Sequence, residues 1–294
     1  GATFELYNRY DKKTLLASGV TDETGTVVFK NLPIVNPSVN AQQGHYYLEE
    51  TTPGENHVLP ENTGKYFSLT TDQLNYEVMF KNPPVKGSVE ILKVDKDNPD
   101  KKLEGAEFAI YRADDLNTVL KTEVTGKDGI ARFEDLRYGN YVIRETKVPD
   151  GYLNDVENGG NDLYDPSIKG YPVAIEKHEQ IIPLTIANPA QKVQVEISKC
   201  NSENKKPLPY VRFNIMSGDD ELIESIVTDS NGKAVSRAIP LDRLGANPYV
   251  VEAAQIPGYE PNNTHYPIKI EAGSTQAIQI VKIDVENIPQ KTEF

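Results

Sequence analysis

The stretch GAEFAIY (residues 105–111) decides the fold, because the chain repeats it. Related stretches occur about one hundred residues away on either side, as GATFELY (1–7) and, more loosely, as YVRFNIM (210–216). Apolar residues alternate within these copies, which is typical of a half-buried strand. Self-similarity at a fixed period indicates tandem copies of one structural unit.

A turn motif follows each copy, as TDETGTVVF (21–29), TGKDGIARF (125–133) and TDSNGKAVS (228–236). Its glycines are 104 and 103 residues apart (129 − 25 and 232 − 129), at Gly25, Gly129 and Gly232. Glycine adopts the positive φ that other residues resist, so each motif predicts a hairpin turn between two strands.

Two further blocks complete each repeat. The first reads YYLEETTP (46–53), YVIRETKVPDGY (141–152) and YVVEAAQIPGY (249–259). The second carries an asparagine near its end and reads YEVMFKNPP (76–84), IIPLTIANPA (181–190) and VKIDVENIPQ (281–290). Together the blocks predict three tandem modules, here called modules one, two and three, over residues 1–84, 85–190 and 191–294.

The composition favours an all-β protein. The chain has 16 Tyr, no Trp and 20 each of Gly and Pro, and aromatic and β-branched residues are enriched in strands. Short alternating segments separated by turns predict an Ig-like β-sandwich for each module. Only RADDLNT (112–118) and PLDRLGA (240–246) predict short helical turns.

Charge and residue usage exclude several classes of function. A net charge of -13 argues against a nucleic-acid partner, because phosphates are bound by clustered Lys and Arg. The single cysteine, Cys200, permits no intramolecular disulfide and no thiolate cluster. DKDNPD (95–100) begins like a calcium loop, but Pro99 and Ala106 occupy ligand positions, so we expect no metal and no cofactor. No apolar stretch is long enough for membrane insertion.

Polar residues end several apolar stripes. In module two, Val89 and Ile91 lead at period two to Lys93, and similar stripes lead to Glu145 and Asn188. In module three the same pattern leads to three matching residues, Lys199, Glu252 and Asn287.

Two interpretations of these six residues are open. The side chains could lie at strand ends and reach water. Alternatively, they lie in the core, where an unpaired charge costs several kcal/mol and the groups become neutral. A neutral lysine is a nucleophile, and its attack on an asparagine carboxamide would release ammonia and leave an amide. The recurrence of the whole set favours the second interpretation.

The strand lysine, the block YVIRETKVPDGY and the terminal ANP resemble the CnaB-type (collagen-adhesin B, prealbumin-like) modules of Gram-positive surface adhesins and pilins. The resemblance implies intramolecular Lys–Asn isopeptide bonds formed with a catalytic Glu. It makes Lys93 and Lys199 the amines, Asn188 and Asn287 the acceptors, and Glu145 and Glu252 the catalytic acids. Module one has only Glu50 and Asn82 at matching positions, so we expect it to lack its N-terminal strand.

The resemblance implies a structural stalk or shaft segment of a cell-wall-anchored adhesin or pilus subunit, extracellular, with signal peptide and anchor outside these residues. Expected partners are neighbouring domains or subunits of the fibre, with host matrix or cell-surface ligands as further candidates. No enzyme turnover is expected, because the crosslink forms once. An alternative function is ligand binding by the long loop 152–170.

Overall fold

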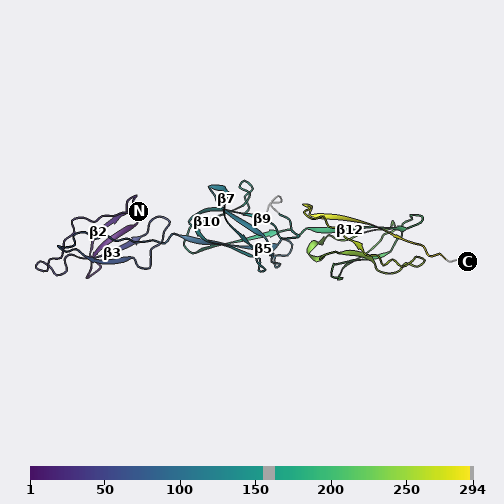
Figure 1. The fold of residues 1–294 in the computed structure, drawn as a ribbon, viewed down its shortest axis with the longest axis horizontal. Helices are drawn as coiled ribbons and strands as arrows, with labels where there is room; N and C mark the ends of the chain where they lie inside the picture. Colours follow the sequence, from purple (N-terminus) through teal and green to yellow (C-terminus); the bar gives the residue numbers. More distant parts are fainter. Residues whose placement is uncertain (155–162, 292–294) are drawn as a thin grey trace.

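The computed structural model describes residues 1–154 and 163–291. They form three units that lie one after another along the long axis of the molecule (Figure 1). Within these described ranges, all regular elements but one short helix are strands, so the expectation of an all-β chain of tandem sandwiches is confirmed. No helix in the described ranges is long and apolar enough to cross a membrane.

Module two has two sheets that enclose one core. One sheet has the order β10-β9-β6-β7 and the other the order β11-β5-β8. The core between them includes Phe108, Phe133 and Ile143, all fully buried. The strands are β5 (Lys86–Asp95), β6 (Glu107–Arg112), β7 (Asp115–Val124), β8 (Ile130–Arg137), β9 (Gly139–Lys147), β10 (Tyr171–Ile175) and β11 (Gln180–Asn188).

Module three repeats this architecture, with shorter strands except for β12 and β19. One sheet has the order β14-β13-β17-β18, and in the other β12 pairs with β15, β16 and β19. The elements are β12 (Lys192–Asn201), β13 (Arg212–Met216), β14 (Leu222–Val227), β15 (Lys233–Val235), β16 (Ile239–Pro240), the 3-10 helix η2 (Leu241–Arg243), β17 (Tyr249–Glu252), β18 (Tyr266–Pro267) and β19 (Ile278–Asn287).

Module one has one sheet, of order β2-β1-β3-β4, within residues 1–84, all of which the structure describes. Its strands are β1 (Thr3–Asn8), β2 (Leu15–Val20), β3 (His45–Thr52) and β4 (Gly64–Ser68). This sheet matches β7-β6-β9-β10 of module two. The segments that correspond to β8 and β11 are not strands here, because no strand equivalent to β5 lies between them to pair with.

The first and last strands of modules two and three are parallel neighbours. β11 pairs with β5 over its whole length, and β19 pairs with β12 in the same way. β5 is also the central strand of its sheet, since β8 pairs antiparallel on its other side. This topology puts the two ends of a module's chain side by side in one sheet.

The glycine turns have the expected backbone but connect different elements from those predicted. Gly25, Gly129 and Gly232 have φ of 78°, 72° and 68°. They do not close hairpins, however, because β7 and β8 belong to different sheets, as do β14 and β15. The strand after the turn pairs with β5 or β12, so the turn carries the chain across the sandwich.

One of the two predicted helical turns is wrong. Residues 115–118 begin the strand β7, which pairs antiparallel with β6, so pairing across the sheet overrides the local preference at 112–118. The other turn is confirmed as η2. The loop 152–170 lies partly outside the described residues, and a ligand site there stays a prediction.

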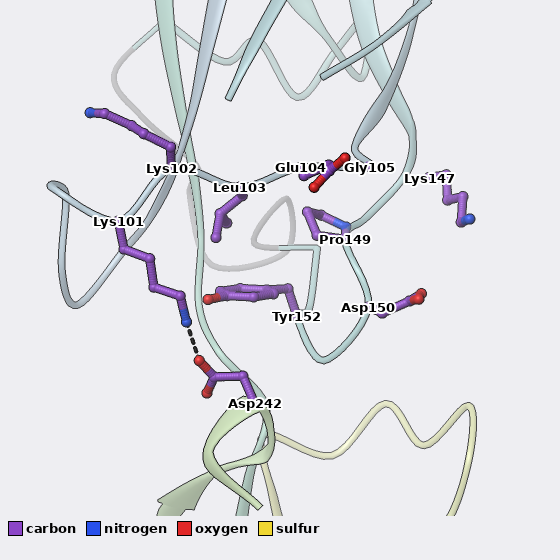
Figure 2. Close-up of a pocket in the computed structure, with 10 residues that line it drawn as sticks. All are labelled: Lys101, Lys102, Leu103, Glu104, Gly105, Lys147, Pro149, Asp150, Tyr152 and Asp242. Carbon is purple, nitrogen blue, oxygen red and sulfur yellow. Dashed lines mark hydrogen bonds and ion pairs between the residues drawn. The ribbon is translucent and has the colours of Figure 1, made fainter. Parts of the chain in front are cut away.

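The junction between modules two and three is held from both sides. Gln191 is 7% exposed, and its backbone N–H donates to the Gly151 carbonyl, while its own carbonyl accepts from Leu241 N–H. Figure 2 shows Lys101, in the loop after β5, paired with Asp242 of η2 beside the ring of Tyr152. The linker therefore packs as part of both modules.

Gly129→Ala should destabilise module two more than Gly25→Ala destabilises module one. A Cβ at Gly129 would lie 2.7 Å from the Lys93 carbonyl oxygen, whereas a Cβ at Gly25 meets nothing within 4 Å. Both substitutions carry the strain of positive φ, about 1–2 kcal/mol, and only Gly129→Ala must also displace β5. Hydrogen exchange in urea, measured for each module, would show this difference. Equal losses of stability in the two modules would contradict it.

Candidate functional site

The strand register places the lysine and asparagine of module two close together. Lys93 on β5 is directly opposite Ile186 on β11, and Asn188 lies two residues further along β11. Side chains two residues apart lie on the same face of a strand. The Lys93 and Asn188 side chains therefore project from neighbouring strands into the same part of the core.

Module three has the same register. Lys199 on β12 is opposite Val285 on β19, and Asn287 lies two residues beyond it. Both modules thus place lysine and asparagine near the C-terminal ends of their parallel strand pair.

The glutamates come from the facing sheet. Glu145 on β9 pairs with Phe108 of β6, and Glu252 on β17 pairs with Phe213 of β13. Glu50 on β3 pairs with Phe4 of β1 in module one. All three glutamates are thus placed by the phenylalanine of the repeated stretch with which the sequence analysis began.

The three groups of module two are in contact inside the sandwich. Asn188 Nδ2 donates to Glu145 Oε1 at 2.9 Å, and Lys93 Nζ lies 3.5 Å from the same oxygen. Lys93 is 0% exposed, Asn188 1%, and the Glu145 side chain 4%. Lys93 Nζ also donates to the Ile186 carbonyl at 3.4 Å. This burial excludes the interpretation in which the lysine extends to water.

Module three has a slightly looser cluster. Asn287 Nδ2 donates to Glu252 Oε1 at 3.0 Å, and Lys199 Nζ lies 3.9 Å from Glu252 Oε2. Both the Lys199 amine and Glu252 Oε2 are buried without a hydrogen-bond partner among the described residues. Asn262 donates to Asn287 Oδ1 at 2.9 Å.

Burial shifts these groups towards their neutral forms. Loss of solvation raises the pKa of Glu145 and Glu252, against the opposing influence of the nearby lysine and asparagine. Loss of solvation also lowers the pKa of Lys199. Because a neutral amine is the nucleophilic form and a protonated carboxyl can donate a proton, both shifts favour attack of the amine on the carboxamide.

Module one contains the acid and the asparagine only. Asn82 Nδ2 donates to Glu50 Oε1 at 2.5 Å, and Glu50 is 1% exposed. Glu50 Oε2 and Asn82 Oδ1 are buried and have no hydrogen-bond partner among the described residues. The pair therefore has the arrangement of the other two modules without an amine beside it.

Several residues that support the clusters were not predicted from the sequence. Tyr152 donates to Asp95 at 2.9 Å, and Asn201 donates to Tyr259 at 3.2 Å, so a tyrosine contacts the residue two positions after each lysine. The recurrence of GY in the third block could have indicated these contacts. Asn262 has no counterpart in the repeats, and its contact depends on the course of a loop.

Comparison with known families agrees with this architecture. The family model described as the SpaA prealbumin-like fold domain matches residues 1–84, 87–158 and 193–284, which is most of the chain. The chain belongs to this family. It is thus built from prealbumin-like, CnaB-type modules of the kind found in Gram-positive surface adhesins and pilins.

A solved structure and two curated proteins are similar to this chain. The TIE protein of Bacillus anthracis is 25% identical with a TM-score of 0.78, over 98% of this chain and 47% of that chain. The collagen adhesin of Staphylococcus aureus is 24% identical over 67% of this chain and 18% of its own length. Colossin-A of Dictyostelium discoideum is 27% identical over 74% of this chain and 2% of its own length. The chain therefore spans less than half of each of these relatives.

In the Asn287→Ala variant, the free energy of unfolding should rise with pH in the alkaline range and fall with pH in the acidic range. Burial lowers the pKa of Lys199 from 10.5, so the free energy of unfolding should rise with pH between the folded pKa and 10.5. The rise should be about 1.4 kcal/mol per unit of lowering. Burial raises the pKa of Glu252 from 4.5, so stability should fall as pH rises from 4.5 through the folded pKa.

Hydrogen exchange of β12 and β19 in urea, at a series of pH values, would measure both effects. The matched control is the double variant Lys199→Met/Asn287→Ala, which has no amine and should lose only the alkaline rise. An identical alkaline rise in both proteins would contradict the assignment to Lys199.

Proposed function

We propose that this chain is a shaft segment of an extracellular, cell-wall-anchored adhesin or pilus subunit, and that Lys–Asn isopeptide bonds stabilise modules two and three. One observation supports the crosslink above others. Glu145 Oε1 contacts both the lysine nitrogen that would attack, at 3.5 Å, and the asparagine nitrogen that would leave, at 2.9 Å.

This contact allows one carboxyl group to move the proton that the reaction requires. The neutral amine of Lys93 attacks the side-chain carbonyl carbon of Asn188, and a new C–N bond forms. Glu145 accepts a proton from the attacking nitrogen and gives one to the departing nitrogen. The C–N bond of the carboxamide breaks, ammonia leaves, and the glutamate returns to its starting protonation state.

In module three, each oxygen of Glu252 would serve one of the two nitrogens in this proton transfer. Oε1 contacts the nitrogen of Asn287, and Oε2 faces the amine of Lys199. Each bond consumes its lysine and its asparagine, so the reaction occurs once per module. We infer from this that the lysine, glutamate and asparagine of each module do not act as an enzyme with repeated turnover.

The position of the crosslink supports a mechanical role. Tension on the two ends of module two would shear β5 against β11, because these strands are parallel neighbours and lead to opposite ends of the module. An amide between Lys93 and Asn188 carries this load from one strand directly to the other. The bond also closes a loop of about one hundred residues, which by analogy with a disulfide stabilises the module by on the order of 4 kcal/mol.

The acidic, disulfide-free composition is consistent with this role, since the crosslinks would do what disulfides do in many secreted proteins. We further propose that the partners are neighbouring domains or subunits of a surface fibre. The family match and the similarity to the collagen adhesin of Staphylococcus aureus support this proposal.

High-resolution mass spectrometry of the intact chain should find a mass lower by two molecules of ammonia than the sequence requires. Lys93→Arg, Asn188→Ala and Glu145→Gln should each restore one ammonia and leave the other loss in place. The matched variants in module three, Lys199→Arg, Asn287→Ala and Glu252→Gln, should do the same for the second bond. An unmodified mass for the parent chain would overturn the crosslink.

Single-molecule extension should separate the crosslinked modules from an uncrosslinked one. When the chain is pulled from its ends, the segment from Lys93 to Asn188 should remain closed. In Asn188→Ala this segment of 95 residue steps (188 − 93) should extend by roughly 310–340 Å, at 3.3–3.6 Å per residue. Module three, with Asn287 intact, serves as an internal control. The same extension in the parent chain would contradict the mechanical role.

A further inference from the structure

The acceptor asparagine of module three is held at both ends of its carboxamide. Asn287 Nδ2 donates to Glu252 Oε1 at 3.0 Å, and Asn287 Oδ1 accepts from Asn262 Nδ2 at 2.9 Å. Asn287 itself is 2% exposed. In the reaction proposed above, the nitrogen leaves and the oxygen becomes negatively charged for a time. The two contacts are therefore made to the two atoms of the carboxamide whose charge changes.

Asn262 is fixed by the loop that carries it. This half-buried residue lies between β17 and β18, and its Oδ1 accepts from the backbone N–H of Thr264 at 3.2 Å. Its Nδ2 also donates to the hydroxyl of Tyr266 at 3.0 Å. Because a carboxamide nitrogen carries two hydrogens, it can serve Tyr266 and Asn287 together. The donor is thus in place before the reaction begins.

The backbone N–H of Thr264 determines which way both carboxamides point. A backbone N–H only donates, so the atom of Asn262 that faces it is the oxygen, and the nitrogen of Asn262 faces Asn287. Two carboxamide nitrogens cannot hydrogen-bond to each other, so Asn287 presents its oxygen to Asn262 and its nitrogen to Glu252. Without Asn262, a protonated Glu252 could donate to the oxygen of Asn287 instead, and the leaving nitrogen would then face away from the carboxyl group.

The other two members of the cluster give the carbonyl oxygen of Asn287 no hydrogen bond. Lys199 Nζ lies 3.9 Å from Glu252 Oε2, and neither atom has a hydrogen-bond partner in the described part of the chain. Glu252 Oε1 is already used by the nitrogen of Asn287. The oxygen receives its hydrogen bond from Asn262 instead.

We propose that Asn262 is a catalytic residue of module three, which orients the carboxamide of Asn287 and stabilises the negative charge that forms on its oxygen. The proposal rests on the Lys–Asn crosslink proposed above and adds a fourth residue to it. Asn262 lies outside the repeated blocks, so this part of the site belongs to module three by virtue of its own loop.

The donor acts at the step in which the new bond forms. The nitrogen of Lys199 attacks the side-chain carbon of Asn287, and the electron pair of the C=O bond moves onto Oδ1. A fixed N–H group stabilises this negative oxygen more than it stabilises the neutral carbonyl, which lowers the barrier. When ammonia leaves, the electron pair returns to the C=O bond, Glu252 has moved the proton between the two nitrogens, and Asn262 is unchanged.

The rate of crosslink formation in the whole chain tests this role. The chain is made by cell-free synthesis, quenched in acid at intervals and digested, so that mass spectrometry follows the ammonia loss of each module separately. In Asn262→Ala the loss in module three should be slower by about 100- to 1000-fold, which is the usual effect of removing one donor to such an oxygen. The loss in module two should keep its rate and serves as the internal control.

Asn262→Asp separates the chemistry from the folding of the loop. An aspartate has the same shape and can still accept from the Thr264 N–H, but its carboxylate has no hydrogen to give to Asn287. This variant should slow the ammonia loss at least as much as Asn262→Ala. In a Lys199→Met background, in which module three cannot crosslink, Asn262→Asp should leave the hydrogen exchange of β17 and β19 unchanged.

Tyr266→Phe is a matched control, because it removes another contact of the same nitrogen and keeps the donor to Asn287. It should slow the ammonia loss of module three by far less than Asn262→Asp does. Equal slowing by these two variants would overturn the role of the donor.

The remaining outcomes distinguish this inference from the proposed function. Equal rates in the parent chain and in Asn262→Asp would overturn the role of Asn262 and leave the crosslink standing. Slower crosslinking that is matched by lost exchange protection in the Lys199→Met background would make Asn262 a structural residue and would also overturn it. A parent chain in which module three keeps its ammonia would overturn the crosslink of that module, and this inference with it.

Discussion

The structure depends on burying an amine, a carboxyl and a carboxamide together inside a β-sandwich. Each group alone would strongly disfavour the folded state if charged or unpaired. Each asparagine donates a hydrogen bond to its glutamate, and each lysine nitrogen lies 3.5–3.9 Å from the same carboxyl group. Burial raises the pKa of both glutamates and lowers the pKa of Lys199, which favours the neutral forms. The whole topology serves this contact, because the lysine and asparagine come from one sheet and the glutamate from the other.

The first strand of modules two and three takes part in more of these contacts than any other strand. β5 supplies the amine, pairs with strands on both sides, and holds the turn glycine through the Lys93 backbone. Module one has no strand equivalent to β5 among residues 1–84. Its first sheet and its acid–amide pair are formed, while the residues equivalent to β8 and β11 keep only their alternation.

The sequence predicted the strands and the buried site residues, because both depend on local patterns. Period-two alternation is a local property, so the buried placement of Lys93 and Asn188 could be inferred from their own strands. The recurrence of the same pattern in module three supported this inference. Which strands pair depends on residues far apart in the chain, and for this reason the glycine turns were wrongly expected to close hairpins and 112–118 to form a helical turn. The contact of Asn262 depends on a loop without any repeat, and no local pattern indicates it.

The register of the parallel strands determines which residues of a module would feel a pulling force. Asn188 is four positions before Lys192, where β12 begins. With the proposed amide between Lys93 and Asn188 in place, a load arriving along β5 would cross to β11 at the last residue of that strand and pass into the first strand of the next module. The strands β6 to β10 and their connecting loops would lie outside this path and carry almost none of the load. Surface loops of such a module could therefore change in length and sequence without weakening the path that carries the load.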